Sequence, residues 1–480
     1  MPSFRPKGEI SLNIVKLMES IPVIAIFDVG KTNKKLFLFD EHYRIVYEKT
    51  ARFLEVTDED GFPCENIASL RVSVFDSLNE ILRDKKFDVK AINFSTYGAS
   101  FVYVDAKGNP LAPLYNYLKP YPKSLEDRFY AAFGGRDALA LETASPCSGS
   151  LNSGLQLYRI KHEQPELFEK ISYALHLPQY MSSLITGAYY SDITSIGCHT
   201  HLWDFRKKDY HDWVYKEQLD KKLAPVFPSD KVVEKNIDGK NYHVGIGLHD
   251  SSAALIPYLS NFHEPFVLIS TGTWCISLNP FNHTPLTQQE IQQNCLCYIS
   301  YKGTPVKASR LFAGYEHEQE TKRIAAHFHT DVAVFKTMEY DKRIIDKLNR
   351  SKVFETKLFA DVALHQFKNI TEAYHALMMF IVSEQYNSTT QVLQKGITKK
   401  IFVDGGFGRN SIYMNLLAAV FPDVEVYAAS MAQATALGTA LSIHSYWNSK
   451  PLPNDIIDLK YYSISTDENV HNDYLSHKKF

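Results

Sequence analysis

Short polar turns that follow apolar strands carry the residue types that phosphate transfer requires. The first turn comes directly after the apolar run 21–27 and contains Asp28, Gly30, Lys31, Thr32, Asn33 and Lys35. A glycine lets the backbone approach a phosphate closely, and the hydroxyl, amide and ammonium groups beside it can donate hydrogen bonds. An aspartate at the end of a buried strand can hold Mg²⁺ through water. This turn therefore predicts a phosphate site with Asp28 beside the metal.

The first turn also has the spacing of a P-loop, from Ala25 to Gly30-Lys31-Thr32. A P-loop needs a glycine-rich loop followed by a helix whose N-terminus faces the phosphates. Here residues 26–29 are mostly apolar, and residues 36–39 predict a second strand rather than a helix. The sequence therefore predicts a β-hairpin, whose turn is either a plain connection or a phosphate site.

The second turn repeats this arrangement in the other half of the chain. It follows the apolar run 266–269 and contains Ser270, Thr271, Gly272 and Thr273. Two such turns on two similar domains would face each other across a cleft and hold a polyphosphate between them. The pair is more specific than either turn alone, because a single turn of this kind is common.

The third turn, residues 404–410, lies between a predicted strand and a predicted helix. Gly405 and Gly406 leave room for a ribose or a flat ring against the backbone, and Asn410 ends the turn. The turn does not complete the G-x-G-x-x-G pattern, so a dinucleotide site is disfavoured.

Asp250 is the acidic residue best placed to act as a general base. Small residues follow it, Ser251-Ser252-Ala253-Ala254, and predict a helix that begins at the aspartate. A carboxylate at the cleft can accept a hydroxyl proton while that oxygen attacks a γ-phosphate, a transfer that needs positioning, a metal and a modest base. An aspartate at this place is equally typical of a helix N-cap. The local sequence leaves both roles open.

The elements that must position these residues alternate between strands and helices. Apolar runs predict strands at 21–27, 36–39, 45–50, 91–94, 101–104, 111–115, 266–269, 274–278, 401–403 and 424–428. A Gly108-Asn109 turn is expected to join 101–104 and 111–115 as a hairpin. Helical spacing predicts helices at 66–83, 362–394 and 432–444.

Each half opens with a strand, a polar turn and a strand, and continues with strand–helix units. This order predicts an α/β duplication. We expect the division near residue 260, where residues 257–265 separate the two patterns. The predicted organisation is an N-terminal extension over 1–20, a domain over 21–260 and a domain over 261–480.

The composition indicates a globular protein with a small partner. The 480 residues include 52 Lys and Arg against 54 Asp and Glu, and this net charge of −2 disfavours nucleic acid and membrane surfaces as partners. No apolar run approaches the roughly 18 to 20 residues of a membrane span. The six cysteines are scattered, so we expect a reducing cytoplasm, and the pair Cys295 and Cys297 predicts a buried strand rather than a zinc site.

Taken in order, these segments resemble the FGGY carbohydrate kinases of the actin-like, ribonuclease H-like ATPase superfamily. Residues 28–35 are similar to the family's first phosphate turn, D-x-G-T-T-S-x-R, with lysines at two positions as departures. Residues 270–274 resemble the second phosphate turn, and 405–410 resemble the adenosine-binding G-G-G-x-x-N run, with Phe407 in place of a glycine. Residues 434–440 are similar to the family's A-T-A-L-G-x-A helix.

The resemblance implies two duplicated ribonuclease H-like domains with a cleft between them, and ATP and Mg²⁺ as cofactors. It implies ATP contacts at Gly30, Lys31, Thr32, Asn33, Lys35, Thr271, Gly272, Thr273, Gly405, Gly406 and Asn410. The metal would lie near Asp28.

Two further motifs resemble those of the rhamnulokinases within this family. His249-Asp250-Ser251-Ser252-Ala253 is similar to their H-D-T-A-S-A motif, and Thr96-Tyr97-Gly98 is similar to their T-W-G motif. By this resemblance Asp250 is the catalytic base. Thr96, Tyr97, Gly98 and His249 would contact the sugar.

One departure concerns the substrate. Where rhamnulokinases commonly carry Arg-Asp after the hairpin, this chain has Tyr117-Leu118-Lys119. The resemblance implies a ketose or related polyol of five or six carbons, with a 6-deoxyketohexose such as rhamnulose or fuculose first and xylulose or ribulose next. The alternative from another class is an actin-like ATPase that binds or assembles without phosphorylating a sugar. The oligomeric state stays open.

The run His199-Thr200-His201 suggests a metal site, because alternate residues of a strand share one face. No Asp, Glu or further His stands at a clear third spacing from the two histidines. We therefore interpret this segment as an ordinary strand.

Overall fold

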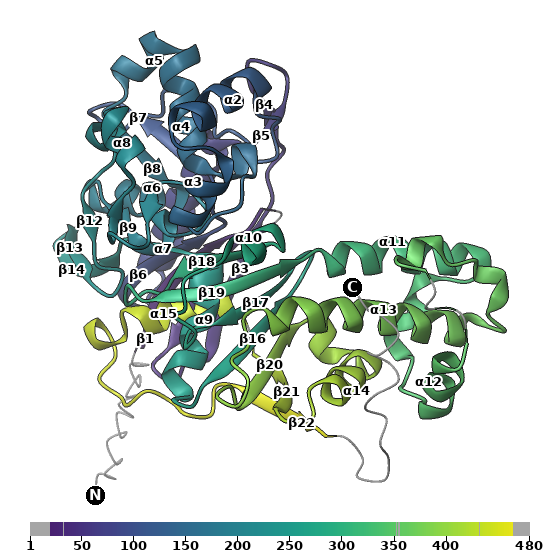
Figure 1. Ribbon diagram of the computed structural model, residues 1–480. Helices are drawn as coiled ribbons and strands as arrows, with labels where there is room; N and C mark the ends of the chain where they lie inside the picture. The colour runs from purple at the N-terminus through teal and green to yellow at the C-terminus, as the bar shows by residue number, and fades with distance from the viewer. Residues whose placement is uncertain (1–19, 32, 352, 354–355, 432, 464–480) are drawn as a thin grey trace, which may run out of the picture.

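The computed structural model describes residues 20–463 except 32, 352, 354–355 and 432, so the predicted extension over 1–20 lies outside the described residues apart from its last residue. Two mixed seven-stranded sheets form the centre of the molecule, and helices cover them (Figure 1). No helix in this described part of the chain is long and apolar enough to cross a membrane.

The first sheet is built from the N-terminal half of the chain. Its strands are β1 (Ile21–Val29), β2 (Lys34–Asp40), β3 (Ile45–Ala51), β6 (Phe87–Thr96), β13 (Val232–Ile237), β14 (Lys240–Gly245) and β15 (Leu248–His249). The order is β13-β14-β6-β1-β2-β3, with β15 added to β6. The strands β1 and β2 form the predicted antiparallel hairpin, which rules out a P-loop because no helix follows the turn.

The second sheet repeats this plan. Its strands are β16 (Phe266–Thr271), β17 (Cys275–Asn279), β18 (Cys295–Ile299), β19 (Pro305–Leu311), β20 (Lys400–Gly405), β21 (Glu425–Ser430) and β22 (Asp458–Tyr462). The central strand β16 pairs antiparallel with β17 and parallel with β20, as β1 does with β2 and β6. The predicted α/β duplication is confirmed. Cys295 and Cys297 lie buried in β18, as predicted.

The predicted hairpin at 101–104 and 111–115 is wrong in its second strand. The strand β7 (Phe101–Val104) pairs instead with β8 (Tyr173–His176), about seventy residues later in the chain. Residues 105–110 do form a turn, in which the Gly108 amide donates to the Asp105 carbonyl. The chain then leaves the strand, because only an isolated bridge joins Val104 to Pro110.

Two helices join the sheets. Helix α9 (Asp250–Asn261) runs from the first sheet to the second, and it contacts α15 (Ala434–Ser442), which packs against β1 and β6 (Figure 1). A Cβ at Gly438 would lie 1.8 Å from the Ala253 carbonyl oxygen, so the two helices meet backbone to backbone. The apolar core at this junction includes Ile24, Ile26, Phe37, Phe39, Ala253, Ile256, Ala436 and Leu437.

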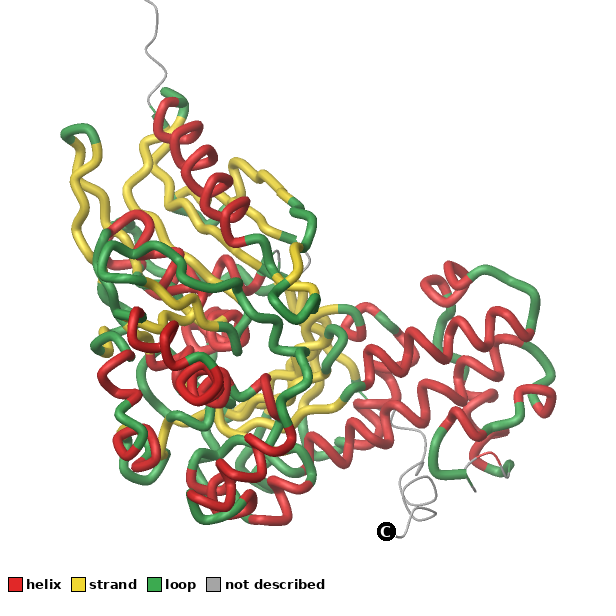
Figure 2. The backbone as a smooth tube through the Cα atoms, turned by 90° about the horizontal axis from the view of Figure 1, so that it is seen from above, coloured by secondary structure: helices red, strands yellow, loops and turns green. Residues whose placement is uncertain are grey.

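The C-terminal half also carries an arm of helices that extends to one side of the molecule (Figure 2). Its helices are α11 (Ala313–His327), α12 (Lys342–Asn349), α13 (Ile370–Thr390) and α14 (Ser411–Val420). The helix predicted at 362–394 is therefore shorter, because the Asn369 side chain accepts from the Glu372 amide and starts α13 at residue 370. Helix α1 (Ile67–Arg83) begins after its predicted first residue, Asn66, which is its N-cap.

Candidate active site

Asp28 lies at the end of β1, between two neighbouring strands. Strand register places it opposite Ser95 on β6 and Lys35 on β2. The Ser95 hydroxyl donates to Asp28 Oδ1 at 2.9 Å. The pKa of Asp28 is raised to about 6. Burial is the largest cause and the Asp250 charge adds to it, while the Ser95 hydrogen bond and the Lys35 charge oppose the shift. Asp28 and Asp250 therefore lie close enough to interact.

Asp250 is the first residue of α9 and lies at the carboxyl end of the first sheet. The N-cap of this helix is His249, so the N-cap interpretation of Asp250 is wrong. Asp250 Oδ1 accepts from the Ser251 amide at 2.6 Å, and about a third of the side chain is exposed (36%). Burial raises the pKa of Asp250 to about 6, and the two hydrogen bonds from Ser251 oppose this shift. A carboxylate with this pKa is ionised at pH 7 and basic enough to accept a proton.

His249 and Gly98 fit against each other. Strand register pairs His249 on β15 with Thr96 on β6, and a Cβ at Gly98 would lie 2.7 Å from the His249 ring. Only glycine leaves room for the imidazole here. His249 Nε2 lies 3.3 Å from Asp250 Oδ1, and burial lowers the pKa of His249 to about 3. The neutral ring and the carboxylate therefore lie side by side. The Thr96 hydroxyl donates to the Tyr97 carbonyl and is fully buried.

Tyr97 lies between the first turn and the Asp250 side of the site. Lys31 Nζ lies 5.7 Å from the centre of the Tyr97 ring and 5.9 Å from that of Tyr117. Burial, followed by the Glu65 charge, raises the pKa of Tyr97 well above its usual value. Glu65 in turn forms a buried ion pair with Lys34, at 2.9 Å.

The other donors of the first turn are held by neighbouring side chains. Asn33 Oδ1 accepts from Arg52 at 2.9 Å, and Lys35 Nζ donates to Glu48 at 3.1 Å. The Gly30 amide donates to the Asn33 carbonyl at 2.9 Å and closes the turn. Thr32 lies outside the described residues. The structure therefore brings Asp28 and Lys31 near Asp250 and Tyr97, respectively. Asn33 and Lys35 are instead held by Arg52 and Glu48.

The second and third turns lie side by side at the carboxyl ends of β16 and β20. The Thr271 hydroxyl donates to the Asp404 carbonyl at 2.6 Å and accepts from the Phe407 amide at 3.1 Å. Gly405 has φ of +93°, and a Cβ there would lie 2.1 Å from the Thr271 carbonyl oxygen. The Thr271 side chain thus links the second turn to the third. Gly272 and Thr273, the next two residues of the second turn, are exposed.

A cavity of about 780 Å³ opens beside these turns, between the second sheet and the helical arm. Its lining includes Gly272, His317, Glu318, Lys336, Tyr374, Gly406, Arg409 and Asn410. The size and mixed polarity suit a nucleotide, since small-molecule sites span about 300–1,000 Å³. The backbone of Gly406 has no atom within 4 Å of an added Cβ and borders open space.

Asn410 and Phe407 shape this cavity in ways that sequence did not predict. Asn410 is the N-cap of α14, since its Oδ1 accepts from the amides of residues 412 and 413. Its Nδ2 donates to the Tyr374 hydroxyl at 2.7 Å, and that hydroxyl lies 3.0 Å from His317 Nε2. Phe407 packs on Tyr413 with ring centres 4.7 Å apart, so the aromatic ring that replaces a glycine turns into the core.

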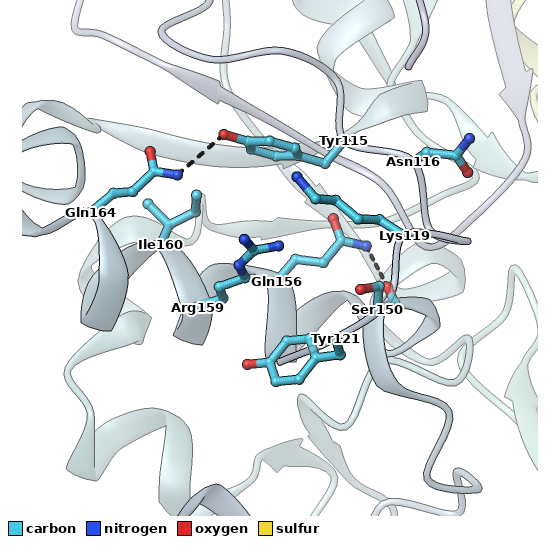
Figure 3. Close-up of a pocket in the computed structure, with 9 residues that line it drawn as sticks. All are labelled: Tyr115, Asn116, Lys119, Tyr121, Ser150, Gln156, Arg159, Ile160 and Gln164. Atoms are coloured by element: carbon cyan, nitrogen blue, oxygen red, sulfur yellow. Dashed lines mark hydrogen bonds between the residues drawn. The ribbon is translucent and has the colours of Figure 1, made fainter. Parts of the chain in front are cut away.

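A second, much smaller cavity lies in the N-terminal half (Figure 3). Its volume of about 20 Å³ is enough for one water and too small for a sugar. Lys119 lines this cavity, and its Nζ is paired with Asp58 at 2.5 Å and with Asp60 at 2.7 Å. Lys119 is therefore held by these two acids within the N-terminal half.

Tyr117, from the same departing segment, lies in the site. Its ring centre is 6.0 Å from that of Tyr97. Burial raises the pKa of Tyr117, and the Asp250 charge adds to this shift. An aromatic side chain therefore lies where the resemblance would place a charged pair.

Sequence reasoning missed Ser95 and Arg310. Arg310 on β19 lies 5.6 Å from the centre of the Trp274 ring, and its Nε is buried without a hydrogen-bond partner among the described residues. Burial is the main cause of the pKa shifts of Cys198 and His199, and the Arg310 charge is a further cause in both. This cation from the second sheet therefore reaches the His249 side of the site. No local motif marks either residue, because both are placed by strand register.

Known proteins with a similar sequence cover most of the chain. Residues 23–255 match the N-terminal domain of the FGGY family of carbohydrate kinases, and residues 263–451 match the C-terminal domain of carbohydrate kinase FGGY. A rhamnulokinase of Oceanobacillus iheyensis is 20% identical over 445 residues, which cover 86% of this chain and 91% of the relative. An L-fuculokinase of Escherichia coli is 21% identical over 267 residues, which cover 52% of this chain and 55% of the relative.

Solved structures show the same fold. A carbohydrate kinase from Novosphingobium aromaticivorans matches with a TM-score of 0.75 and 21% identity, over 92% of this chain and 94% of that one. A ligand-bound xylulose kinase from Lactobacillus acidophilus matches with a TM-score of 0.74 and 15% identity, over 92% and 93% of the two chains. Because both domain patterns match in order over most of its length, this chain belongs to the FGGY family and is a carbohydrate kinase.

Proposed function

We propose that the protein transfers the γ-phosphate of ATP to a hydroxyl of a ketose, with Asp250 as the general base. The observation that carries this proposal is the pairing of Asp250 with Asp28. Two carboxylates from α9 and β1 interact at one end of the first sheet, and both have a pKa of about 6. We assign sugar binding to residues 21–260 and ATP binding to residues 261–480.

The proposed reaction needs little covalent chemistry from the protein. The sugar hydroxyl gives its proton to Asp250 while its oxygen forms a bond to the γ-phosphorus, and the bond from that phosphorus to the bridging oxygen of ADP breaks. His249, neutral beside Asp250, would bind a sugar hydroxyl, and Thr96, Tyr97 and Gly98 would contact the sugar beside it. The side chain of Asp250 opens towards solvent, which leaves the carboxylate accessible to a substrate.

The Asp250 charge raises the pKa of Asp28, and two carboxylates at one end of the sheet also favour a divalent cation beside them. Asp28, with Ser95 fixing one of its oxygens, would hold Mg²⁺ through water. When bound, the cation neutralises charge on the transferred phosphate. The cavity of about 780 Å³ would take the adenosine, with Gly406 and Asn410 along its wall and Thr271 and Gly272 towards the phosphates. Gly405 and Thr273, next to Gly406 and Gly272 in the chain, would contact the nucleotide from the same turns.

For the sugar, we propose a 6-deoxyketohexose such as rhamnulose or fuculose, with xylulose or ribulose next. The rhamnulokinase and L-fuculokinase relatives support this order. Tyr117 beside Tyr97 also supports it, because an aromatic wall suits a methyl group better than a charged pair does.

The test is ADP release with a panel of rhamnulose, fuculose, xylulose, ribulose and glycerol. We expect sugar-dependent release with at least one ketose, and a loss of about 10²–10⁴-fold in kcat for Asp250→Asn, the usual contribution of a general base. Asp137→Asn is the matched control, because Asp137 is an exposed aspartate in the first turn of another helix, α3 (Arg136–Glu142).

The outcomes distinguish a sugar kinase from an actin-like ATPase that has no sugar substrate. Full turnover by Asp250→Asn would refute the base assignment. ADP release that no sugar increases would instead favour an ATPase that binds or assembles.

A further inference from the structure

Three side chains that can ligate a transition metal lie together next to Asp250. The candidate ligand atoms of Cys198, His199 and His249 all lie within 4.8 Å of one another. Cys198 Sγ is 3.1 Å from His249 Nε2, and the rings of His199 and His249 are perpendicular with centres 6.4 Å apart. The cluster joins the turn after α7 (Ile193–Ile196) to the start of α9.

The backbone at His199 differs from the predicted strand and explains this arrangement. Residues 197–199 form a turn, and His199 and His201 have φ of +43° and +63°. The two histidines therefore do not share a face, and the prediction of a strand over 199–201 is wrong. His201 lies apart, between Tyr130 and Thr143, while His199 turns towards His249.

The hydrogen bonds leave lone pairs on both histidines of the cluster. His199 Nδ1 lies 3.3 Å from the Leu151 carbonyl oxygen, which only accepts, so Nδ1 carries the proton and Nε2 is free to ligate. His249 Nε2 faces the Cys198 thiol and Asp250, and His249 Nδ1 has no hydrogen-bond partner among the described residues.

The donor set selects the kind of metal. One sulfur and two imidazole nitrogens suit Zn²⁺, whereas Mg²⁺ prefers oxygen ligands. Asp250 Oδ1, 3.3 Å from His249 Nε2, lies beside the cluster and adds a second negative charge to that of a thiolate. Three protein ligands leave a fourth position of the tetrahedron open, as in zinc sites that exchange a water.

We propose that Cys198, His199 and His249 form a Zn²⁺ site that inhibits the enzyme. On binding, the Cys198 thiol loses its proton to solvent and a sulfur–zinc bond forms, while His199 and His249 each give a nitrogen lone pair. The ion would then occupy the space beside Asp250 and take His249 away from the sugar. The metal site stands on the cluster alone, and its inhibitory effect rests on the proposed function.

The first experiment measures binding and does not depend on activity. The purified full-length protein is titrated with Co²⁺, a probe for Zn²⁺. We expect a thiolate-to-cobalt charge-transfer band and the visible bands of tetrahedral cobalt at one equivalent, and we expect Zn²⁺ to displace the probe. Cys198→Ser should lose the charge-transfer band and weaken binding by at least about 10–100-fold, the loss usual for altering a metal site. Cys147→Ser is the control, because Cys147 is a partly exposed thiol outside the cluster.

His199→Gln is a second variant that should also weaken binding, in case Cys198→Ser unfolds. Thermal unfolding in the absence of metal checks that each variant is folded. An unchanged cobalt spectrum in folded Cys198→Ser would overturn the site, and so would the absence of tetrahedral cobalt bands in the wild-type protein.

The second experiment measures turnover with the best sugar under buffered free Zn²⁺. We expect inhibition of the wild type that is competitive with the sugar and reversed by a chelator. Cys198→Ser keeps a donor near His249 Nε2, so it should retain turnover and lose the inhibition. Equal inhibition of both proteins would overturn the inhibitory role. If no sugar is phosphorylated, the proposed function fails while the cobalt titration still decides the metal site.

Discussion

Asp28 and Asp250 interact although they come from distant parts of the chain. Burial is the largest cause of each pKa shift, and the negative charge of Asp250 adds to the pKa shift of Asp28. The folded protein therefore holds two carboxylates that bind protons more tightly than free aspartate does. For a kinase this is useful, because a carboxylate with a pKa near 6 is a stronger base than one near 4 and is still ionised at neutral pH.

This arrangement predicts the pH dependence of the reaction. Protonated Asp250 cannot accept the hydroxyl proton, and protonated Asp28 would hold the metal less well. We therefore expect kcat/KM for the sugar to fall at least about tenfold per pH unit below about 6 and to level off above about 7. Initial rates at subsaturating sugar, measured from about pH 5 to pH 8, check this. A flat profile across the range would contradict the assignment of Asp250 as the base.

A second prediction concerns the buried ion pair beside Tyr97. Lys34 and Glu65 are only 7% and 4% exposed, so Glu65→Gln leaves a buried ammonium without its charge partner. We expect the free energy of unfolding to fall by about 3–5 kcal/mol. Glu55→Gln is the matched control: its partner Lys31 is 3.5 Å away and Glu55 is half exposed, so the loss should stay below about 1 kcal/mol. Urea unfolding of both variants measures the difference, and equal losses would contradict it.

At the scale of elements, the sequence predicted those strands and turns that depend on residues close together in the chain. The apolar runs around Asp28 and Thr271 each predicted a strand, a turn and a strand, and the structure has β1–β2 and β16–β17 there. Contacts between distant segments were missed. Phe101–Val104 finds its partner strand in β8, and His199 takes a left-handed conformation that no apolar pattern signals. Arg310 and Ser95 reach the site through strand register, which the local sequence pattern around each residue does not reveal.

The crossing of α9 and α15 predicts the effect of a single methyl group. Alanine favours a helix over glycine by about 1 kcal/mol, yet at Gly438 its Cβ would lie 1.8 Å from the Ala253 carbonyl oxygen. We expect the clash to outweigh the helix preference, so that Gly438→Ala destabilises by about 1–3 kcal/mol. Gly406→Ala is the control, since no atom lies within 4 Å of its added Cβ. Thermal unfolding compares the two, and a stabilised Gly438→Ala would contradict the close crossing.

At the scale of the whole molecule, the two sheets place separate parts of the site. Asp28, Tyr97 and His249 lie at the carboxyl end of the first sheet, and Gly272 and Gly405 lie at that of the second. The fold could be predicted from the repeated order of strands and turns. Which polar side chains are left to contact a ligand could not be predicted, because Thr271, Asn33 and Lys35 form hydrogen bonds within the protein.

The placement of site residues on two sheets predicts how ligands stabilise the protein. A ligand that binds only the folded state adds about 2.7 kcal/mol at a concentration of 100 times its Kd. We expect MgATP or a non-hydrolysable analogue alone to raise Tm, and the analogue with the best sugar to raise it by more than the sum of the two separate shifts, because both ligands would favour a closed cleft. Differential scanning fluorimetry measures this. Strictly additive shifts would contradict closure around both ligands.

The apolar junction of α9, α15 and the first sheet also governs how the chain can be divided. The chain passes once from the first matched region to the second, but the core does not follow that boundary, because Ala436 and Leu437 are buried with Ile24 and Phe37. An isolated fragment of residues 21–260 would present this apolar face to water, and we expect it to aggregate. A peptide of residues 430–448 supplied in trans should restore solubility. Helix α15 is thus part of the folding unit that begins with β1.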